Sequence, residues 1–288
     1  MSDPTIPGTN GSESLPERFF ERLRADRQAY PLPLRLRETA ESFAHSVLAL
    51  LFPHFCRSQD FGRDAPGDEY RLVEVLLEQM LRPLVEARCE AVAAAFLREL
   101  PSIHAALHED ARAIYEGDPA AESIDEVILA YPGFLAIAVY RIAHVLYEEG
   151  VPLLPRVLTE YAHRETGIDI HAGARIGAAF SIDHGTGVVV GETTVIGDRV
   201  RIFQGVTLGA LCVSKEMART KRHPTIGDDV VIYANATILG GETEVGARSL
   251  VGGNVWLTQS VPPDSVVTRT SEVRRRAPGR DELLEFYI

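Results

Sequence analysis

Residues 169–210 read DIHAGARIGAAFSIDHGTGVVVGETTVIGDRVRIFQGVTLGA. Aliphatic residues return at a regular spacing in this stretch and beyond it, at positions 170, 176, 182, 190, 196, 202, 208, 226, 232, 238, 245, 251 and 257. Nine of the twelve intervals are six residues long, a phase that a β-sandwich of alternating strands has no reason to hold. The period predicts a parallel β-helix with three hexapeptides to each triangular coil and the aliphatic side chains pointing inward.

One interval in this pattern is eight residues long instead of six. It runs from Ile182 to Val190 and adds two residues around Asp183 and His184. Extra residues in a regular strand pattern form a bulge, which redirects side chains. We therefore expect Asp183 and His184 to project outward from the coil.

Another interval, from Leu208 to Ile226, is eighteen residues long and predicts a protruding loop at 209–225. The only two lysines of the chain, Lys215 and Lys221, fall in this loop, although the net charge of the chain is -12. A chain this acidic is not expected to bind nucleic acid or an anionic membrane through bulk charge. The loop instead predicts a local site for an anionic ligand, although a solvated turn would have the same composition.

Composition predicts a folded protein of the α+β class. The chain has 288 residues, of which 45% are hydrophobic and 24% are charged, as is usual for globular proteins. Apolar side chains recur at helical spacings in residues 18–166, which predicts an α-helical domain before a β-helix domain at 167–265. The polar residues 1–17 are expected to be a disordered tail, and residues 266–288 a C-terminal tail.

Prolines in the helical domain indicate where helices begin. Pro101, Pro132 and Pro152 are each expected to open a helix, because proline fits the first turn. Asp118 followed by Pro119 has the form of an N-cap with proline in the first turn. The simplest interpretation of Asp118 is therefore a helix cap.

The remaining signals concern the compartment. The cysteines Cys56, Cys89 and Cys212 are far apart and form no CxxC pair, so neither a disulfide framework nor a zinc ribbon is expected. The longest weakly charged stretch, 127–140, is shorter than the ~20 residues of a membrane span, and the N-terminus lacks a basic start with an apolar run. These features predict a cytoplasmic protein with no membrane partner.

Four motifs stand in an order and spacing typical of one enzyme family. They are DIH at 169–171, DHGTG at 183–187, VVGET at 189–193 and RHP at 222–224. Over about residues 115–265 the chain resembles the serine O-acetyltransferases of the hexapeptide-repeat superfamily. The resemblance implies a left-handed β-helix, a homotrimer or a dimer of trimers, and acetyl transfer from acetyl-CoA to L-serine in cysteine biosynthesis. It implies no permanently bound cofactor and no metal.

Acetyl transfer from a thioester to an alcohol requires a base for the hydroxyl proton and an acid for the leaving thiolate. A histidine can serve as both, since its ordinary pKa lies near neutral pH. The resemblance implies His184 in this role, with Asp169 fixing its imidazole. It also implies four ligands for the charged groups of serine: Asp118 and Asp183 for the ammonium, and Arg222 and His223 for the carboxylate.

The resemblance further implies that coenzyme A lies in a groove between adjacent subunits. The chain reads Gly-Ala-Leu-Cys at 209–212, where the best-known shorter enzymes have Gly-Gly-Thr-Gly, and its loop is about four residues longer. The longer loop is expected to bring a lysine to the coenzyme A phosphates. The implied contacts are Gly209, Ala210, Ala234 and Gly253, with Lys215 and Lys221 from the loop.

The C-terminal residue, Ile288, suggests a protein partner. Many relatives end in an isoleucine that enters the active site of cysteine synthase, although this chain lacks their GVPAR sequence before the tail. The resemblance thus implies cysteine synthase as a partner. A short amphipathic helix that completes the fold would explain the same segment.

Three other functions fit parts of the same sequence. A hexapeptide acetyltransferase for a sugar or an antibiotic would also use one histidine, but a sugar would not need the paired charge recognition that Asp118, Asp183 and the RHP motif offer. A zinc hydratase of the γ-carbonic anhydrase kind would need three ligands such as His171, His184 and His223. A catalytically silent scaffold that regulates cysteine synthase would not need His184.

Overall fold

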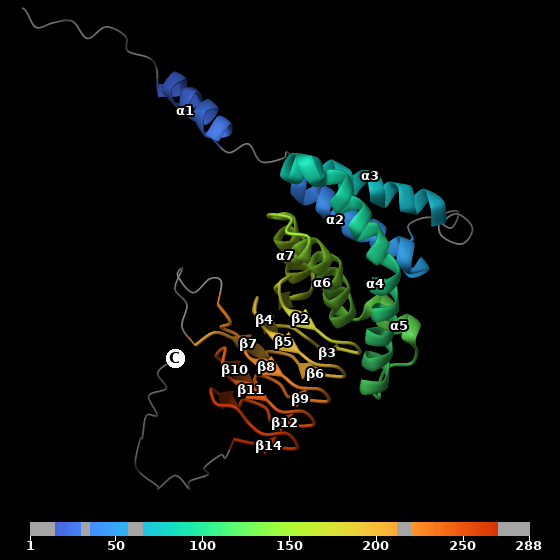
Figure 1. Cartoon of the computed structure of the whole chain (residues 1–288), viewed down its shortest axis with the longest axis vertical. Coiled ribbons are helices and arrows are strands. Elements are labelled where there is room, and N and C mark those ends of the chain that lie inside the picture. Colours follow the sequence, from blue (N-terminus) through green and yellow to red (C-terminus); the bar gives the residue numbers. More distant parts are fainter. Residues whose placement is uncertain (1–14, 30–34, 57–65, 212–219, 270–288) are drawn as a thin grey trace, which may run out of the picture.

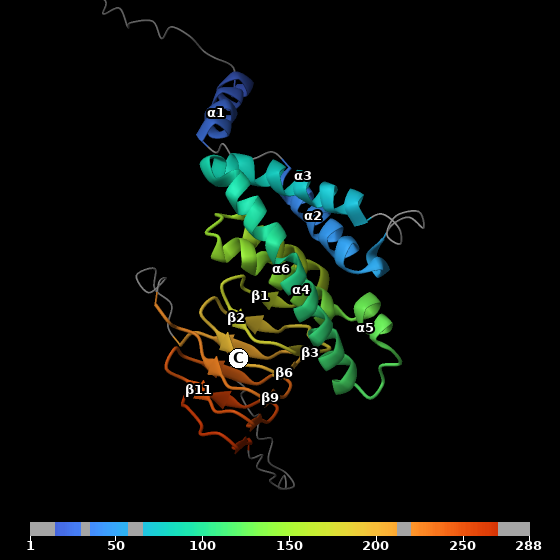
Figure 2. The ribbon, with the colours of Figure 1, turned by 45° about the vertical axis from the view of Figure 1, so that its right-hand side comes forward.

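The structure is a computed structural model that describes residues 15–29, 35–56, 66–211 and 220–269. Helices come first along the chain and a stack of short parallel strands follows, as Figures 1 and 2 show. The helices are α1 (Leu15–Ala29), α2 (Leu36–Leu51), η1 (Pro53–Phe55), α3 (Pro66–Val85), η2 (Glu86–Arg88), α4 (Cys89–Gly117), α5 (Ile124–Ala130), α6 (Pro132–Glu148) and α7 (Leu154–Thr166). Lys215 and Ile288, for which we predict roles above, lie outside the described residues.

The predicted helix starts are only partly correct. Pro132 opens α6 as expected. The prediction for Pro101 is wrong, because this proline lies inside α4, whose buried face continues through it. The prediction for Asp118 is also wrong, because this residue ends α4 and does not cap the next helix. The N-cap of α5 is Ser123, whose hydroxyl accepts a hydrogen bond from an amide of the first turn. The last helix begins at Leu154, two residues after Pro152.

The strands form three parallel sheets, which are the three faces of one prism. Face A contains β1, β4, β7, β10 and β13, face B contains β2, β5, β8 and β11, and face C contains β3, β6, β9, β12 and β14. The strands are β1 (Asp169–Ile170), β2 (Arg175–Ile176), β3 (Ser181–Asp183), β4 (Val189–Val190), β5 (Val195–Ile196), β6 (Arg201–Phe203), β7 (Thr207–Gly209), β8 (Thr225–Ile226), β9 (Val231–Ile232), β10 (Thr237–Leu239), β11 (Glu244–Val245), β12 (Leu250–Val251), β13 (Trp256–Leu257) and β14 (Val266–Val267). The predicted β-helix is confirmed.

The register of the sheets explains the six-residue period. On face A, Ile170 pairs with Val190, Val190 with Leu208, Leu208 with Ile238 and Ile238 with Leu257. The periodic residues therefore stack in columns inside the prism, and nearly all of them are buried. A second inward ring lies two residues before many of them, at the corners: Phe180, Val188, Val200, Val206, Val230, Ala236 and Val255.

Glycines line the corner between faces B and C because successive coils approach closely there. A Cβ on Gly177 would lie 2.7 Å from the carbonyl carbon of Gly197, and one on Gly197 would lie 2.9 Å from that of Gly227. Real Cβ atoms do not approach backbone atoms so closely. The column of glycines thus sets the spacing of the coils.

The helices α4 and α6 are fixed to the first coil by buried polar contacts. The Asp110 carboxylate, which is fully buried, accepts bonds from Arg141 at 2.5 and 2.8 Å and from the Phe180 amide at 2.9 Å. The same guanidinium donates to the Gly177 carbonyl at 2.9 Å, and the Tyr140 hydroxyl donates to the Ala174 carbonyl at 2.6 Å. The bonds to the carbonyls of Gly177 and Ala174 give partners to corner groups that are not paired within the sheets.

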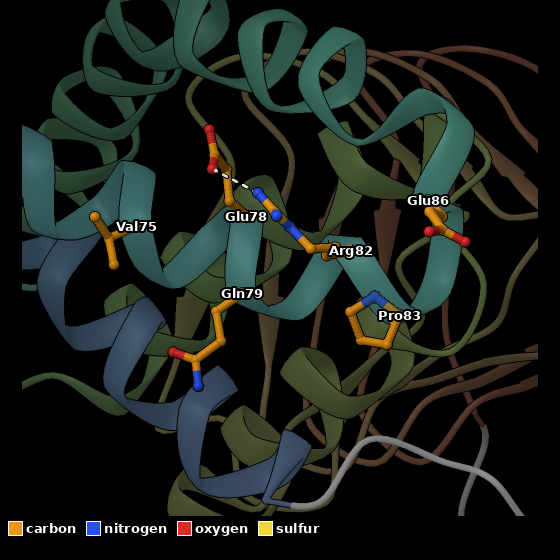
Figure 3. A pocket seen from close by; sticks show the side chains of 6 residues that line it. All are labelled: Val75, Glu78, Gln79, Arg82, Pro83 and Glu86. Carbon is orange, nitrogen blue, oxygen red and sulfur yellow. Dashed lines mark ion pairs between the residues drawn. The ribbon is translucent and has the colours of Figure 1, made fainter.

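Two further surface features complete the described fold. A groove along α3 is lined by Val75, Glu78, Gln79, Arg82, Pro83 and Glu86, with Arg82 3.6 Å from Glu78 (Figure 3). Among the described helices, none alone is long and apolar enough to cross a membrane. Taken together α5 and α6 reach that length and apolarity, but they are bent by 73° where they meet.

Candidate active site

The candidate residues lie along the two edges that border face A of the prism. The C–A edge consists of the corners between faces C and A: residues 184–188, 204–206, 233–236 and 252–255. The A–B edge consists of the described corners between faces A and B: residues 171–174, 191–194, 210–211, 220–224 and 240–243. The described part of the site therefore has two halves.

His184 is the first corner residue after β3, on the C–A edge. Its backbone adopts the left-handed conformation, with φ of 57°, which is uncommon for a residue other than glycine. The imidazole is 73% exposed, and its Nε2 atom is 3.6 Å from a carboxylate oxygen of Asp183. The predicted outward projection at the eight-residue interval is thus observed for His184. The same conformation recurs at other corners of the coils, for example at Arg199, Asp229 and Asn235, so it is a property of the β-helix and does not by itself indicate a site.

Two carboxylates from different elements line a pocket at the end of β3, and one of them, Asp183, adjoins His184. Asp183, at the end of β3, also receives a bond from the Arg201 guanidinium at 2.7 Å. Asp118, at the end of α4, accepts a bond of 2.7 Å from the Tyr131 hydroxyl and one of 2.8 Å from the Ala120 amide. A small pocket is lined by Ile114, Asp118, Tyr131, Ser181, Ile182, Asp183 and Arg201.

Hydrogen bonding favours the charged form of Asp118. The bond from Tyr131 is the main reason that the pKa of Asp118 is lowered, and the Ala120 amide adds to the effect. In return, the bond to Asp118 raises the pKa of Tyr131 to about 12. Asp183 is paired with Arg201 in the same pocket, so the carboxylate of Asp118 is the charge there that suits a cationic group such as an ammonium.

Asp169 begins β1 and lies beside the same edge. The Gly187 amide donates to the Gly167 carbonyl at 2.8 Å, and the Asp169 amide donates to the Val188 carbonyl at 2.9 Å. The corner that begins at His184 therefore runs along the start of β1. No hydrogen bond joins the side chains of Asp169 and His184 in the described structure, so their pairing stays a prediction.

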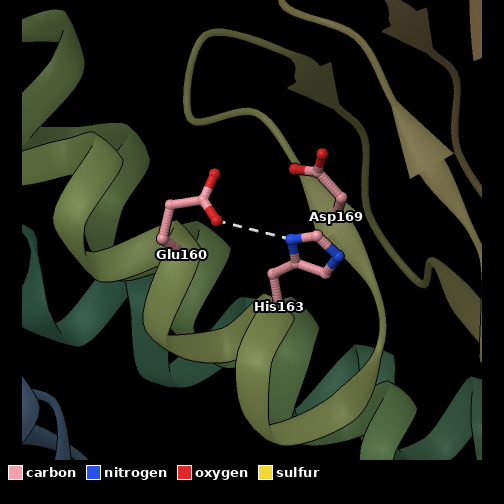
Figure 4. Close-up of side chains that lie close together, drawn as sticks. All are labelled: Glu160, His163 and Asp169. Carbon is pink, nitrogen blue, oxygen red and sulfur yellow. Dashed lines mark hydrogen bonds and ion pairs between the residues drawn. The ribbon is translucent and has the colours of Figure 1, made fainter.

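The Asp169 carboxylate instead faces α7. Ligand-capable atoms of Glu160, His163 and Asp169 all lie within 4.8 Å of one another (Figure 4). Nδ1 of His163 is 3.4 Å from Glu160, and the Arg156 guanidinium contacts Glu160 and lies 3.8 Å from Asp169. Because Arg156 is a fixed positive charge between the two acids, we assign no metal to this cluster.

Arg222 and His223 lie on the other edge, the A–B edge. The Arg222 guanidinium forms an ion pair with Glu192, which also accepts a bond of 2.9 Å from the Tyr147 hydroxyl. This places the guanidinium at the prism surface beside α6. His171 stands over the same tyrosine, with ring centroids 5.9 Å apart.

His223 is buried, and its Nδ1 atom accepts a bond of 3.1 Å from the Thr193 amide. Burial lowers the pKa of His223 to about 4, and the charges of Arg222 and Lys221 act in the same direction. Its ring fills the space over Gly191, where a Cβ would lie 2.0 Å away. Of the three histidines that a zinc hydratase would need, His171 and His223 thus lie on one edge and His184 on the other.

The predicted coenzyme A contacts also divide between the edges. Gly209 and Ala210 lie where face A meets the A–B edge, whereas Ala234 and Gly253 lie on the C–A edge, next to one another. The Lys221 ammonium donates to the carbonyls of Thr193 at 2.7 Å and Pro224 at 3.1 Å. Burial lowers its pKa, and it holds the end of the loop against the prism.

Sequence reasoning missed four polar residues of these edges. Tyr131 looked only like the residue before a helix-opening proline, and Arg201 like an ordinary outward strand residue. Glu192 and Thr193 belong to the VVGET motif, which is part of the resemblance to the enzyme family, but the motif assigns no role to either residue. All four hold or neutralise a candidate residue.

Known proteins share both the sequence and the fold. Residues 70–139 match the N-terminal family model of serine acetyltransferase. A plasmid-encoded serine acetyltransferase from Synechococcus elongatus is 45% identical over 268 residues, which cover 84% of this chain and 83% of the relative. The serine acetyltransferase of Bacillus subtilis is 48% identical over 56% of this chain and 72% of its own length.

Solved structures give the same result. Serine acetyltransferase 1 of Entamoeba histolytica in complex with L-cysteine is 39% identical and superimposes with a TM-score of 0.74, covering 78% of this chain and 86% of that one. The soybean enzyme in complex with serine is 33% identical, with a TM-score of 0.57 and coverage of 81% and 92%.

The helical region and the parallel β-helix, together with the relatives that share them, identify the chain as an acyltransferase of the β-helix class. Within this class, the similar proteins identify the family. The chain belongs to the serine acetyltransferases.

Proposed function

We propose that this protein transfers the acetyl group of acetyl-CoA to the hydroxyl of L-serine, giving O-acetyl-L-serine and coenzyme A. The observation that carries the proposal is the group beside the C–A edge, where Asp118 and Asp183 line one small pocket and Asp183 adjoins the exposed His184. Two carboxylates beside a general base suit an acceptor that has an ammonium near its hydroxyl. This reaction is the first step of cysteine biosynthesis.

The chemistry proposed for His184 follows from its exposure and its place beside Asp183. Its imidazole removes the proton of the serine hydroxyl while that oxygen bonds to the acetyl carbon of the thioester. The C–S bond then breaks, and the imidazolium returns the proton to the coenzyme A sulfur. Asp169 supports the imidazolium in this proposal, and the backbone amide of Ala210 stabilises the oxyanion.

We propose that the complete site forms between two copies of the chain. The outward residues of face A beyond β1 are uncharged: Val189, Thr207, Thr237 and Trp256, of which Trp256 is 70% exposed. Three prisms that turn face A toward a threefold axis bring the A–B edge of each copy to the C–A edge of the next. Arg222 and His223 of one copy would then face Asp118, Asp183 and His184 of its neighbour.

The same arrangement serves the donor. Gly209 and Ala210 from one copy and Ala234 and Gly253 from the next would line the groove for coenzyme A. Lys221 is engaged by two carbonyls, so its approach to a phosphate would require it to exchange these partners. We further propose inhibition by L-cysteine, which shares the carboxylate and ammonium of serine. Binding of cysteine synthase at Ile288 stays a prediction about residues outside the described structure.

The proposed activity is tested by thiol release from acetyl-CoA in the presence of serine, homoserine, threonine or a galactoside. We expect release with serine only, and its loss in His184→Ala. Serine-dependent release that persists in His184→Ala would contradict the mechanism. Preference for a galactoside would instead support a sugar acetyltransferase.

A further inference from the structure

The strand β6 carries an outward-pointing arginine, Arg201, beside the acidic pocket of the candidate site. Its Nη2 atom donates to Oδ2 of Asp183 at 2.7 Å, and a Cβ on Gly117, at the end of α4, would lie 3.1 Å from its Nη1 atom. In the register of face C, Arg201 is level with Ser181, so its side chain reaches forward along the sheet. The guanidinium thus contacts both the end of α4 and the carboxylate that precedes His184.

Two stacked aromatic rings hold this guanidinium in place. The Cζ atom of Arg201 lies over the ring of Phe203, 4.7 Å from its centroid. The ring of Phe203 stacks on that of Tyr233, with centroids 5.0 Å apart and ring planes inclined by 12°. A cation over an aromatic face is attracted to the ring, and the planar guanidinium suits such stacking. Arg201 is therefore fixed by an ion pair at its end and by a ring beside it.

The two carboxylate oxygens of Asp183 have different neighbours. Oδ2 accepts the bond from Arg201, whereas Oδ1 lies 3.6 Å from Nε2 of His184, which is too long for a hydrogen bond. The side chains of Asp183 and Arg201 are 16% and 27% exposed, so solvent screens their attraction less than that of a fully exposed pair. The carboxylate beside the histidine is thus held by a cation and not by the imidazole.

Release of Asp183 from Arg201 would change the state of the imidazole. A carboxylate without its cation attracts a proton to the nearest ring nitrogen and forms a charge-assisted bond with it. That nitrogen is Nε2 of His184. The proposed reaction needs a ring nitrogen that is free to accept the proton of the serine hydroxyl. A proton already held on Nε2 by Asp183 would block this step.

Other charged groups near His184 belong to the same balance. The bond from Tyr131 is the main cause of the lowered pKa of Asp118, and the charges of Arg201 and His184 also lower it. Asp169 of β1 is the proposed partner of His184, and a guanidinium of α7 approaches it to 3.8 Å. Arg201 is therefore the cation that opposes the acids on the pocket side of the histidine.

We propose, on the basis of the proposed function, that Arg201 is a positioning residue that acts through Asp183. It neutralises this carboxylate and holds it apart from His184, so that Nε2 stays free to accept the hydroxyl proton. In this role Arg201 touches neither serine nor acetyl-CoA. Its loss should therefore impair the reaction most at low pH, where the imidazole is easily protonated, and least at high pH.

The pH dependence of kcat/KM for serine tests this role. In Arg201→Met the acid limb of the profile should move upward by about one pH unit, with kcat/KM lowered about threefold near pH 7 and restored near pH 9. Arg201→Lys keeps a cation beside Asp183 and should keep the acid limb of the wild type. The matched control is Arg199→Met, which breaks the ion pair with Asp229 at another corner and should leave the profile unchanged.

A second measurement does not depend on acetyl transfer. Diethyl pyrocarbonate reacts with the unprotonated imidazole, and modification of the exposed His184 can be followed by peptide mass spectrometry. The pH midpoint of this reaction should be about one unit higher in Arg201→Met than in the wild type. A shifted midpoint without acetyl transfer would support the effect of Arg201 on His184 and contradict the proposed function. An unchanged midpoint, with kcat/KM lowered equally at every pH, would show a merely structural role and overturn the proposal.

Discussion

At the residue scale, the Tyr131 hydroxyl and the Asp118 carboxylate show how one hydrogen bond sets the charge of a binding group. The bond is 2.7 Å long and is the main cause of the lowered pKa of Asp118. The tyrosine comes from the segment before α6 and the acid from the end of α4. If Asp118 binds the ammonium of serine, Tyr131 is a positioning residue for serine and not for coenzyme A.

We therefore expect Tyr131→Phe to raise the KM for serine by about tenfold, since a hydrogen bond to a charged group is lost. The KM for acetyl-CoA and kcat should change little. Steady-state kinetics with each substrate varied in turn measures this difference. Tyr115→Phe, at an exposed tyrosine of α4, is the matched control. Equal effects of the two variants on serine would refute the role of Tyr131.

The buried His223 predicts a dependence of stability on pH. Its pKa is lowered to about 4 in the folded protein, whereas an unfolded chain has a histidine pKa of about 6.5. Between these values the unfolded state binds more protons, so the contribution of His223 is complete above pH 6.5 and is lost as the pH falls toward 4. His223→Asn keeps an acceptor for the Thr193 amide but does not titrate.

Urea unfolding of wild type and His223→Asn at several pH values between 4 and 7 checks this expectation. The difference in unfolding free energy between the two proteins should shift in favour of the variant as the pH falls. A difference that stays constant over this range would show that His223 is protonated in the folded protein as readily as in the unfolded one.

At the scale of elements, the sequence predicts the β-helix well because each hexapeptide carries its own inward residue. Ile170, Ile196 and Ile232 sit in columns as the period requires. The second inward ring, which includes Phe180, was missed because its members lie in corners, where no regular strand pattern identifies the inward side. The prediction that Pro101 opens a helix is wrong because packing along the long buried face of α4 outweighs the preference of proline for a first turn.

The sequence predicts individual residues of the candidate site but not how they are arranged in space. The motifs identified Asp183 and His223, but nothing in their spacing indicates that they occupy opposite edges of face A. The edge on which a corner lies depends on which two strands it joins. The eighteen-residue interval between Leu208 and Ile226 changes the spacing between corners, so the edge is not evident from residue numbers alone. Residues from the helical region, such as Tyr131, reach the candidate site only through tertiary packing, and they belong to none of the four motifs.

The contact between α6 and β3 gives a test at this scale. A Cβ on Gly133, in the first turn of α6, would lie 2.3 Å from the carbonyl oxygen of Ile182. Gly133→Ala should therefore destabilise the protein by about 1–3 kcal/mol and lower kcat, because the displaced strand carries Asp183 and leads into His184. Thermal unfolding and the acetyl-transfer assay measure the two effects.

The matched control is Gly67→Ala, in the first turn of α3. Nothing lies within 4 Å of a Cβ at this position, and alanine reduces the freedom of the unfolded chain, so stability should rise by about 0.4–1 kcal/mol. Equal effects of Gly133→Ala and Gly67→Ala would show that α6 is not fixed against β3.

At the scale of the whole molecule, the proposed serine ligands fall into two groups that one copy of the chain does not bring together. Acidic residues and the histidine lie on the C–A edge, whereas Arg222 and the buried His223 lie on the A–B edge. Serine carries both charges within a few bonds, so it cannot contact groups on opposite edges of a prism face at once. Assembly around face A removes this difficulty, and it predicts that catalysis requires more than one copy of the chain.

Subunit complementation tests this requirement. His184→Ala damages only the C–A edge and Arg222→Ala only the A–B edge, so each variant alone should be nearly inactive. A trimer that mixes the two contains one undamaged pair of edges out of three, so mixed trimers purified through both tags should have about a third of wild-type activity. Activity is measured after co-expression with two affinity tags, by thiol release. If the mixed trimers are as inactive as either variant, the two edges do not meet between subunits, and each site lies within one chain.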